Sequence, residues 1–124
     1  MSEIKKELVL IPKSEKYIQY MLEVIMKLPR VEKFNIGNEY KLSMYKMLEN
    51  ILMLSKIGNE EKIKHINIID AQLNTQRIFL RIMYKYKWID EKKFNYSIEL
   101  IYELGKIIGG LLKYYGKNIK ERIW

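Results

Sequence analysis

The sequence has no cysteine and a single histidine, His65, in 124 residues. The absence of cysteine excludes disulfides, thiolate metal sites and cysteine nucleophiles, and it permits a reducing compartment. Long apolar runs are also lacking. The apolar run near the start of the chain extends only from Leu8 to Ile11, which is too short for a secretory signal or a membrane span. We therefore expect a cytoplasmic protein with no membrane-spanning segment.

Helix-breaking residues are scarce, with two prolines and six glycines. No segment alternates apolar and polar residues as a half-buried strand would. Apolar residues instead recur at intervals of three and four, which predicts helices at about 14–28, 39–56, 60–87 and 91–115. The whole chain, 1–124, has the length of one domain, so the expected fold is all-α, an up-down-up-down four-helix bundle.

Local signals indicate the ends and buried faces of these helices. Ser14, Asn59 and Asp90 are the expected N-caps of the first, third and fourth helices. Phe34, in the first connection, is expected to plug the end of the bundle. The spacing in the second helix predicts a buried face of Leu42, Tyr45, Leu48, Ile51, Leu52 and Ser55.

The first and fourth helices have regular apolar faces. In the first helix the expected buried residues are Tyr17, Met21, Val24, Ile25 and Leu28. The apolar face of the fourth helix contains Gly105 and Gly109, one turn apart. Because a glycine inside a helix costs about 0.5–1 kcal/mol relative to alanine, we expect a neighbouring backbone or bulky side chain to approach both closely.

The third helix has two apolar arcs, and the rest of the chain is organised around it. At about 100° per residue, one arc contains Ile66, Ile69, Leu73, Leu80, Met83 and Tyr84. The opposite arc contains Ile68, Ile78, Phe79, Ile82 and Tyr86. One subunit of a small bundle needs only the first arc for its core. The second arc therefore predicts a homo-oligomer in which these five residues lie at the subunit interface.

The formal net charge of +8 favours anionic partners such as nucleic acid. Arg77, Arg81 and Lys85 follow one another at intervals of four on the third helix, a spacing that serves neither burial nor pairing with acids on the same helix. With Lys87, Lys113 and Lys117 they are the candidate residues for binding nucleic acid or a partner protein. The alternative is an ordinary solvated face.

Aromatic residues alternate with lysines from Tyr84 to Trp88. Such a segment can offer stacking platforms for bases within a basic groove. Aromatic side chains are more often core or interface residues, and that alternative stays open here.

The sequence does not favour an enzyme. Glu61 lies one turn before His65, but two ligands do not make a metal site, so we expect no metal and a structural role for this histidine. Glu99 and Glu103 are also one turn apart, on the side of the fourth helix away from its apolar face. Phosphate-binding glycine loops are lacking. We expect no catalytic residues and no cofactor.

Three groups of residues carry a resemblance to a known family. They are Leu28-Pro29 with Glu32-Lys33-Phe34, then Ala71, Leu73, Arg77, Leu80 and Arg81, then Ile101, Glu103-Leu104-Gly105-Lys106, Ile108 and Gly109-Gly110-Leu111-Leu112-Lys113. In their order and spacing the chain resembles, over roughly residues 12–115, the accessory variability determinant family of diversity-generating retroelements. It departs from the family pattern at Asn35, where a proline is usual, and at Glu39, where a basic residue is usual.

The resemblance implies a small basic four-helix bundle that assembles into a barrel-like homopentamer. It implies binding to a reverse transcriptase and to RNA or DNA, in support of mutagenic cDNA synthesis, without catalysis by the bundle itself. A confusable group is the bundle proteins of ribosomal-RNA intervening sequences. That alternative predicts a protein–protein adaptor with no direct nucleic-acid role, but its Asn-Ile-Ala-Glu-Gly-like motif is missing between Tyr45 and Leu54.

Overall fold

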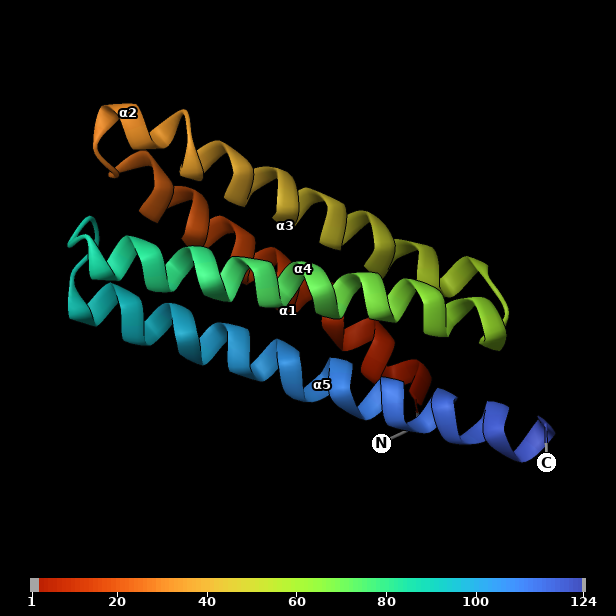
Figure 1. Ribbon diagram of the computed structural model, residues 1–124. Helices are drawn as coiled ribbons and strands as arrows, with labels where there is room; N and C mark the ends of the chain where they lie inside the picture. Colours follow the sequence, from red (N-terminus) through yellow and green to blue (C-terminus); the bar gives the residue numbers. More distant parts are fainter. Residues whose placement is uncertain (1–2, 124) are drawn as a thin grey trace.

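Four long helices lie lengthwise beside one another in the computed structural model, which describes the backbone of residues 3–123 and the side chains of residues 3–116 (Figure 1). The elements are α1 (Glu3–Met26), α2 (Arg30–Lys33), α3 (Ile36–Met53), the 3-10 turn η1 (Leu54–Lys56), α4 (Asn59–Lys85) and α5 (Glu91–Ile123). The predicted all-α up-down bundle is confirmed. No helix in the described part of the chain is both long and apolar enough to cross a membrane.

Helix α1 begins eleven residues earlier than the sequence indicated, at Glu3 rather than Ser14. Pro12 lies inside the helix, where it removes one backbone donor. The helix continues through it because Leu10 and Glu7, on the same face as Tyr17, are also buried. Ser14 is therefore not an N-cap, and its Oγ is buried without a partner among the described residues. The five residues predicted for the buried face of α1 and its end are all buried.

The segment between α1 and α3 differs from the prediction in two ways. It contains the single helical turn α2, which begins directly after Pro29. Phe34 does not plug the bundle, since 74% of its side chain is exposed. The turn of α2 lets α3 start at Ile36, three residues before the predicted start, with Gly37 packed tightly against α1. A Cβ on Gly37 would lie 2.9 Å from Ile25 Cγ2 and 3.1 Å from the carbonyl oxygen of Glu32.

The close packing of Gly37 sets the rotation of α3. Its buried residues are Gly37, Tyr40, Ser43, Met44, Met47 and Ile51, followed by Leu54 in η1. The predicted face was therefore wrong in large part: Leu42, Tyr45 and Leu52 are 42–53% exposed, and Ser55 is exposed. Ile51 is buried and Leu48 packs against the core, as predicted. Helix α3 has apolar residues on two sides, and the contact with α1 selects the other one.

The ends of α4 and α5 follow local hydrogen bonding. Gly58, rather than Asn59, is the residue before α4. After Lys85 the chain reverses through Lys87, which has a φ of 62°. The Lys87 N–H donates to the Tyr84 carbonyl and the Trp88 N–H to the Met83 carbonyl, both at 2.9 Å, as in a Schellman motif. Asp90 caps α5 as predicted, since its Oδ1 accepts the Lys93 N–H at 2.8 Å.

Helix α5 extends beyond the predicted end at residue 115 and reaches Ile123. A Cβ on Gly105 would lie 3.7 Å from Arg77 Nη2 and 3.8 Å from Leu73 Cδ2, which is ordinary van der Waals contact. No described atom comes within 4 Å of the corresponding position at Gly109. The expected close approach is therefore found at neither glycine, although Gly105 does face α4.

A chain of hydrogen bonds that no sequence pattern indicated crosses the core. The Tyr40 and Tyr17 hydroxyls are 2.6 Å apart, and Tyr17 Oη donates to Gln76 Oε1 at 2.7 Å. Gln76 Nε2 donates to Ser43 Oγ at 3.0 Å, and Ser43 Oγ donates to Gln72 Oε1 at 2.8 Å. Burial raises the pKa of both tyrosine hydroxyls. These bonds join α1, α3 and α4 through buried groups that would otherwise lack partners.

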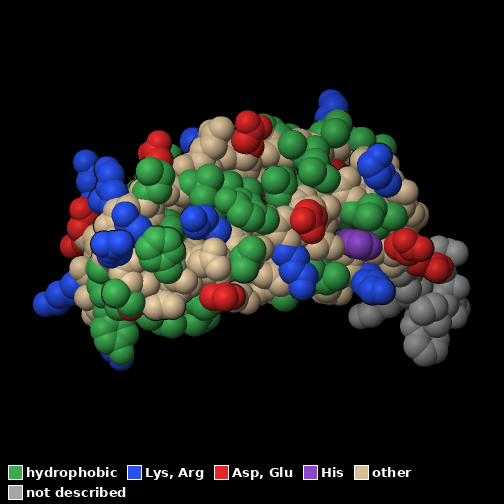
Figure 2. Space-filling view, turned by 90° about the horizontal axis from the view of Figure 1, so that it is seen from above, with side chains coloured by type: hydrophobic (Ala, Val, Ile, Leu, Met, Phe, Trp, Pro, Cys, Tyr) green, Lys and Arg blue, Asp and Glu red, His purple; other side chains and the backbone are tan. Residues whose placement is uncertain are grey.

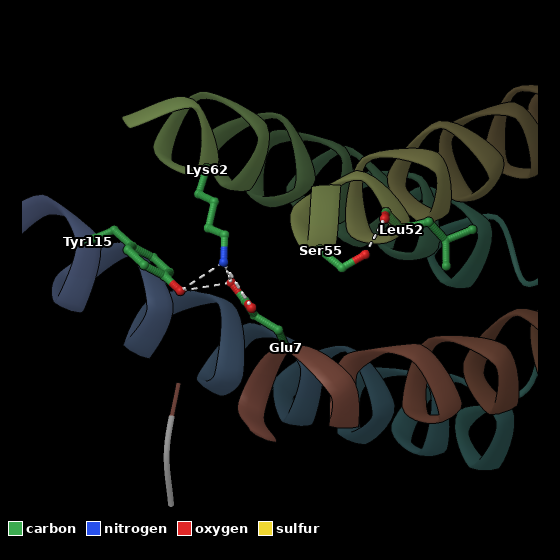
Figure 3. A network of polar contacts seen from close by, with 5 residues as sticks. All are labelled: Glu7, Leu52, Ser55, Lys62 and Tyr115. Carbon is green, nitrogen blue, oxygen red and sulfur yellow. Dashed lines mark hydrogen bonds and ion pairs between the residues drawn. The ribbon is translucent and has the colours of Figure 1, made fainter. Parts of the chain in front are cut away.

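A second polar network ties α1, α4 and α5 together near the start of α1 (Figure 3). Glu7 Oε1 lies 2.9 Å from Lys62 Nζ and accepts a hydrogen bond from Tyr115 Oη at 2.8 Å. The Lys62 ammonium also lies 5.3 Å from the centre of the Tyr115 ring. Burial raises the pKa of the Tyr115 hydroxyl, and its hydrogen bond to the Glu7 carboxylate raises this pKa further.

Candidate nucleic-acid and partner-binding surface

The two predicted features of α4 lie along opposite edges of its outward surface. Ser43 Oγ on α3 lies 3.2 Å from the carbonyl oxygen of Gln72, and the Phe79 ring packs 6.2 Å from that of Tyr40, so this edge borders α3. Arg77 borders α5, because its Nη2 atom lies 3.7 Å from the position that a Cβ on Gly105 would occupy. The second apolar arc therefore follows the α3 edge, and the basic stripe begins at the α5 edge.

Arg77 is held in place by its neighbours. Its side chain is half-buried, and Nη1 donates to Asn74 Oδ1 at 2.7 Å. Burial raises the pKa of the Tyr17 hydroxyl, and the positive charge of Arg77 acts against this rise. Gly105 leaves room for it on α5. Arg77 is therefore an ordered cation at the seam between two helices.

Arg81 and Lys85 differ from Arg77 in being exposed. At intervals of four residues the three side chains form a stripe about 12 Å long, given 1.5 Å of rise per residue. The three cations of the predicted stripe thus lie on one side of α4, the first half-buried against α5 and the next two exposed. The sequence pattern did not distinguish Arg77 from Arg81.

The other three candidate lysines do not join one patch. Lys87 is exposed in the turn after α4, next to the end of the stripe. Lys113 is exposed on α5, about two turns beyond Gly105, the residue that faces Arg77. The side chain of Lys117 lies outside the described residues. Arg77, Arg81, Lys85 and Lys87 therefore follow one another along α4 and the turn after it, whereas Lys113 lies on the neighbouring helix.

The candidate interface residues divide in a similar way. Ile78 is 48% exposed, and Ile68 and Ile82 are half-buried, so all three leave apolar surface in solvent. Phe79 is half-buried and packs against the core. Tyr86, directly after the last residue of α4, is 62% exposed and stacks on Trp88, so it lies in the turn and apart from the apolar surface of Ile68, Ile78 and Ile82.

Helix α3 adds apolar surface that the sequence reasoning missed. Leu42, Tyr45 and Leu52 are exposed because α3 buries its other apolar side, which contains Tyr40, Met44 and Met47. Figure 2 shows hydrophobic side chains across the middle of the face seen from the α3 side. The sequence pattern does contain this apolar side of α3, but we had predicted that it faces the core.

The acidic and histidine positions make structural contacts. His65 Nδ1 lies 2.7 Å from Asn50 Oδ1, a contact that joins α4 to α3. Glu103 pairs with Lys13 at 3.4 Å on the surface between α5 and α1. Among the residues whose side chains are described, no three of His, Cys, Asp and Glu come together as metal ligands would.

Comparison with known proteins gives the fold an independent parallel. A crystal structure of a protein of unknown function from the S23 ribosomal protein family of Bacteroides thetaiotaomicron superposes with a TM-score of 0.80. The superposition covers 87% of this chain and 98% of that one, at 16% sequence identity, so the likeness is one of fold alone. No curated protein matches the chain.

A family model settles the resemblance that the sequence motifs suggested. The model of the bAvd-like family matches residues 8–115, from the first third of α1 to the buried Tyr115 of α5. The match includes the segments on α4 and α5 that meet at Arg77 and Gly105. The chain therefore belongs to the bAvd-like family, the bacterial Avd proteins that have an accessory role in diversity-generating retroelements.

Proposed function

We propose that this protein binds a reverse transcriptase and nucleic acid as a homopentamer, and so supports mutagenic cDNA synthesis without catalysing it. The observation that carries the proposal is the family match over residues 8–115. The stripe of Arg77, Arg81 and Lys85 supports the nucleic-acid part, because guanidinium groups bind phosphate with two parallel hydrogen bonds. In a pentamer the stripe is repeated five times, so weak contacts add up to a strong total affinity.

Alanine in place of Arg81 is expected to weaken polyanion binding while leaving the melting temperature nearly unchanged, because Arg81 is exposed. Each lost phosphate contact is worth about 1 kcal/mol, or roughly fivefold in affinity per subunit. Arg77→Ala should weaken binding and also lower the melting temperature, because its side chain is half-buried against α5. Fluorescence anisotropy with a labelled oligonucleotide and thermal circular dichroism measure the two effects.

Lys56→Ala is the control, since Lys56 is an exposed cation in η1, at the end of the bundle opposite the turn after α4 (Figure 1). It should change neither quantity. Equal losses of affinity for Lys56→Ala and Arg81→Ala would mean that overall charge, rather than the stripe, binds the polyanion. Unchanged affinity with a large drop in melting temperature for the double Arg77→Ala, Arg81→Ala variant would make both arginines structural.

An adaptor that binds only protein is the alternative, and salt distinguishes it. Binding through several phosphates weakens steeply with salt, with a log–log slope of several units, because condensed counterions are released. An apolar interface on Ile68, Ile78 and Ile82 would respond far less. A flat salt dependence of partner binding, with no oligonucleotide binding at low salt, would favour the adaptor.

Aspartate in place of Ile78 is expected to dissociate the assembly before it unfolds the subunit. Ile78 is 48% exposed in the subunit, so a charge there is tolerated in the monomer but not in an apolar interface. Light scattering coupled to size exclusion should give about 75 kDa for the native protein, five times the 15.1 kDa of one chain, and a monomer mass for the variant.

Tyr102→Asp provides the control for this substitution. Tyr102 is 62% exposed on α5, outside the proposed interface, so its replacement should leave the mass unchanged. A native protein that is monomeric at micromolar concentration would refute the pentamer.

A further inference from the structure

The turn between α4 and α5 displays a stacked pair of aromatic rings. The rings of Tyr86 and Trp88 have centroids 5.2 Å apart and planes inclined by 21°. Trp88 is half-buried and packs against the core, whereas Tyr86 is 62% exposed. The tryptophan thus anchors the pair to the bundle, and the tyrosine extends it into solvent.

The backbone keeps this pair in place. Lys87, the residue between Tyr86 and Trp88, has a φ of 62°. This left-handed backbone conformation is unfavourable for residues other than glycine. Hydrogen bonds from the N–H groups of Lys87 and Trp88 to the carbonyls of Tyr84 and Met83 fix the reversal. Because the chain reverses at this one residue, the side chains on either side of it face each other. The platform is therefore formed before any ligand arrives.

The charge around the pair is positive. Residues 85–93 contain four lysines (Lys85, Lys87, Lys92 and Lys93) against Asp90 and Glu91, a net charge of +2. The Asp90 carboxylate already accepts a backbone hydrogen bond at the start of α5. Lys85 and Lys87, on either side of Tyr86, are both exposed. Figure 2 shows Lys and Arg side chains gathered at the left end of the molecule, where Figure 1 places α2 and this turn.

We propose that Tyr86 and Trp88 form a stacking site for an unpaired base of single-stranded nucleic acid, with Lys85 and Lys87 contacting the neighbouring phosphates. The inference rests on the proposed nucleic-acid binding and specifies the form that is bound. A base stacks on an aromatic face whatever its identity, so the site prefers unpaired bases without reading their sequence. In a duplex every base face is already occupied, which leaves only the phosphate contacts of the lysines.

A base is a better occupant of this platform than a protein surface. The turn offers one exposed ring with cations on both sides, which matches a flat base flanked by phosphates. A stable protein interface needs about 800 Å² on each partner, far more than one tyrosine provides.

The test uses Trp88 as its own reporter in a Trp124→Phe variant of the full chain, which leaves one tryptophan. A short oligothymidylate should quench Trp88 fluorescence on binding. An abasic oligomer of the same length, with the same phosphates and no bases, should bind more weakly and cause no quenching. A duplex should behave like the abasic oligomer. Tyr86→Leu should lower affinity for the oligothymidylate by roughly 5- to 150-fold, the range of one lost stacking contact, without changing affinity for the abasic oligomer.

Tyr102→Leu is the matched control, because Tyr102 is equally exposed, at 62%, and has the Lys106 ammonium 5.4 Å from its ring centre. It should leave the quenching of Trp88 intact. Anisotropy that reports binding without quenching would overturn the stacking site and leave the proposed function standing. If neither oligomer binds at low salt, nucleic-acid binding itself fails. Quenching by the reverse transcriptase, but not by the oligothymidylate, would overturn the inference and assign the turn to a protein partner.

Discussion

Replacing Glu7 by leucine is expected to lower the free energy of unfolding by about 3–5 kcal/mol, because it leaves a buried cation without its counter-charge. The Glu7 and Lys62 side chains are 9% and 12% exposed, and their charged atoms lie 2.9 Å apart. The Tyr115 hydroxyl loses its acceptor in the same variant. Chemical denaturation followed by circular dichroism gives the free energy directly.

Removing all the polar groups of this network is expected to restore much of that loss. Well-packed apolar residues in place of a buried ion pair are often neutral or stabilising. The triple variant Glu7→Leu, Lys62→Met, Tyr115→Phe should therefore be more stable than Glu7→Leu alone. A single Glu7→Leu variant that loses less than about 1 kcal/mol would mean that water reaches Lys62 in solution and the pair contributes little.

Alkaline pH is expected to unfold the bundle steeply from about pH 10 upward. Burial raises the pKa of the hydroxyls of Tyr17 and Tyr40 above the ordinary value of 10.0. The unfolded chain releases these protons near pH 10, whereas the folded chain retains them and so binds more protons at higher pH. The stabilisation is fully present below pH 10 and is lost as the pH rises through the folded-state values, by about 1.4 kcal/mol per pH unit for each tyrosine.

Absorbance of tyrosinate near 295 nm and circular dichroism, recorded together from pH 9 to 12, check this expectation. The exposed tyrosines should ionise first, and the buried pair only as helicity is lost. In a Tyr17→Phe, Tyr40→Phe variant the stability at neutral pH changes as well, so the quantity to compare is the slope of stability against pH, which should become shallower. Ionisation of every tyrosine with helicity intact would contradict the burial of the pair.

The fold could be predicted from the sequence because its signals are local. The spacing of apolar residues and the Asp90 cap each act within a few residues; the spacing identified the four long helices, and the cap is confirmed. The N-cap predicted at Ser14 was wrong, because α1 begins at Glu3 and continues through Pro12. What kept that helix intact is the burial of Glu7 and Leu10 against distant segments, which no local pattern reports.

The buried face of α3 shows the limit most clearly. Two sets of apolar residues on α3 satisfy helical spacing: Tyr40, Met44 and Met47 on one side, and Leu42 and Leu52 on the other. The sequence alone does not show which set is buried. The choice depends on how closely Gly37 approaches Ile25, a contact between two helices. The same error hid the exposed apolar surface of α3.

The candidate site was predicted in its composition but not in its geometry. Arg77 and Arg81 are the same residue type and lie one turn apart on α4. Only Arg77 packs against α5, where Gly105 leaves room for its side chain, and it is half-buried whereas Arg81 is exposed. The stacked pair of Tyr86 and Trp88 depends on a backbone reversal at a lysine, where sequence signals would favour glycine. The polar chain from Tyr17 to Gln76 brings together residues 59 positions apart.

The order in which the helices pack has a consequence for how the chain folds. Helices α3, α4 and α5 pack against their neighbours in sequence, whereas α1 packs on α3 and also on α5, the helix farthest from it along the chain. The hydrogen bond between Glu7 and Tyr115 closes a loop of 108 residues. Local contacts form early because they require little loop closure, so the three later helices can assemble first. Helix α1 then completes the bundle, and the contacts of Glu7 with Lys62 and Tyr115 join the start of α1 to α4 and α5.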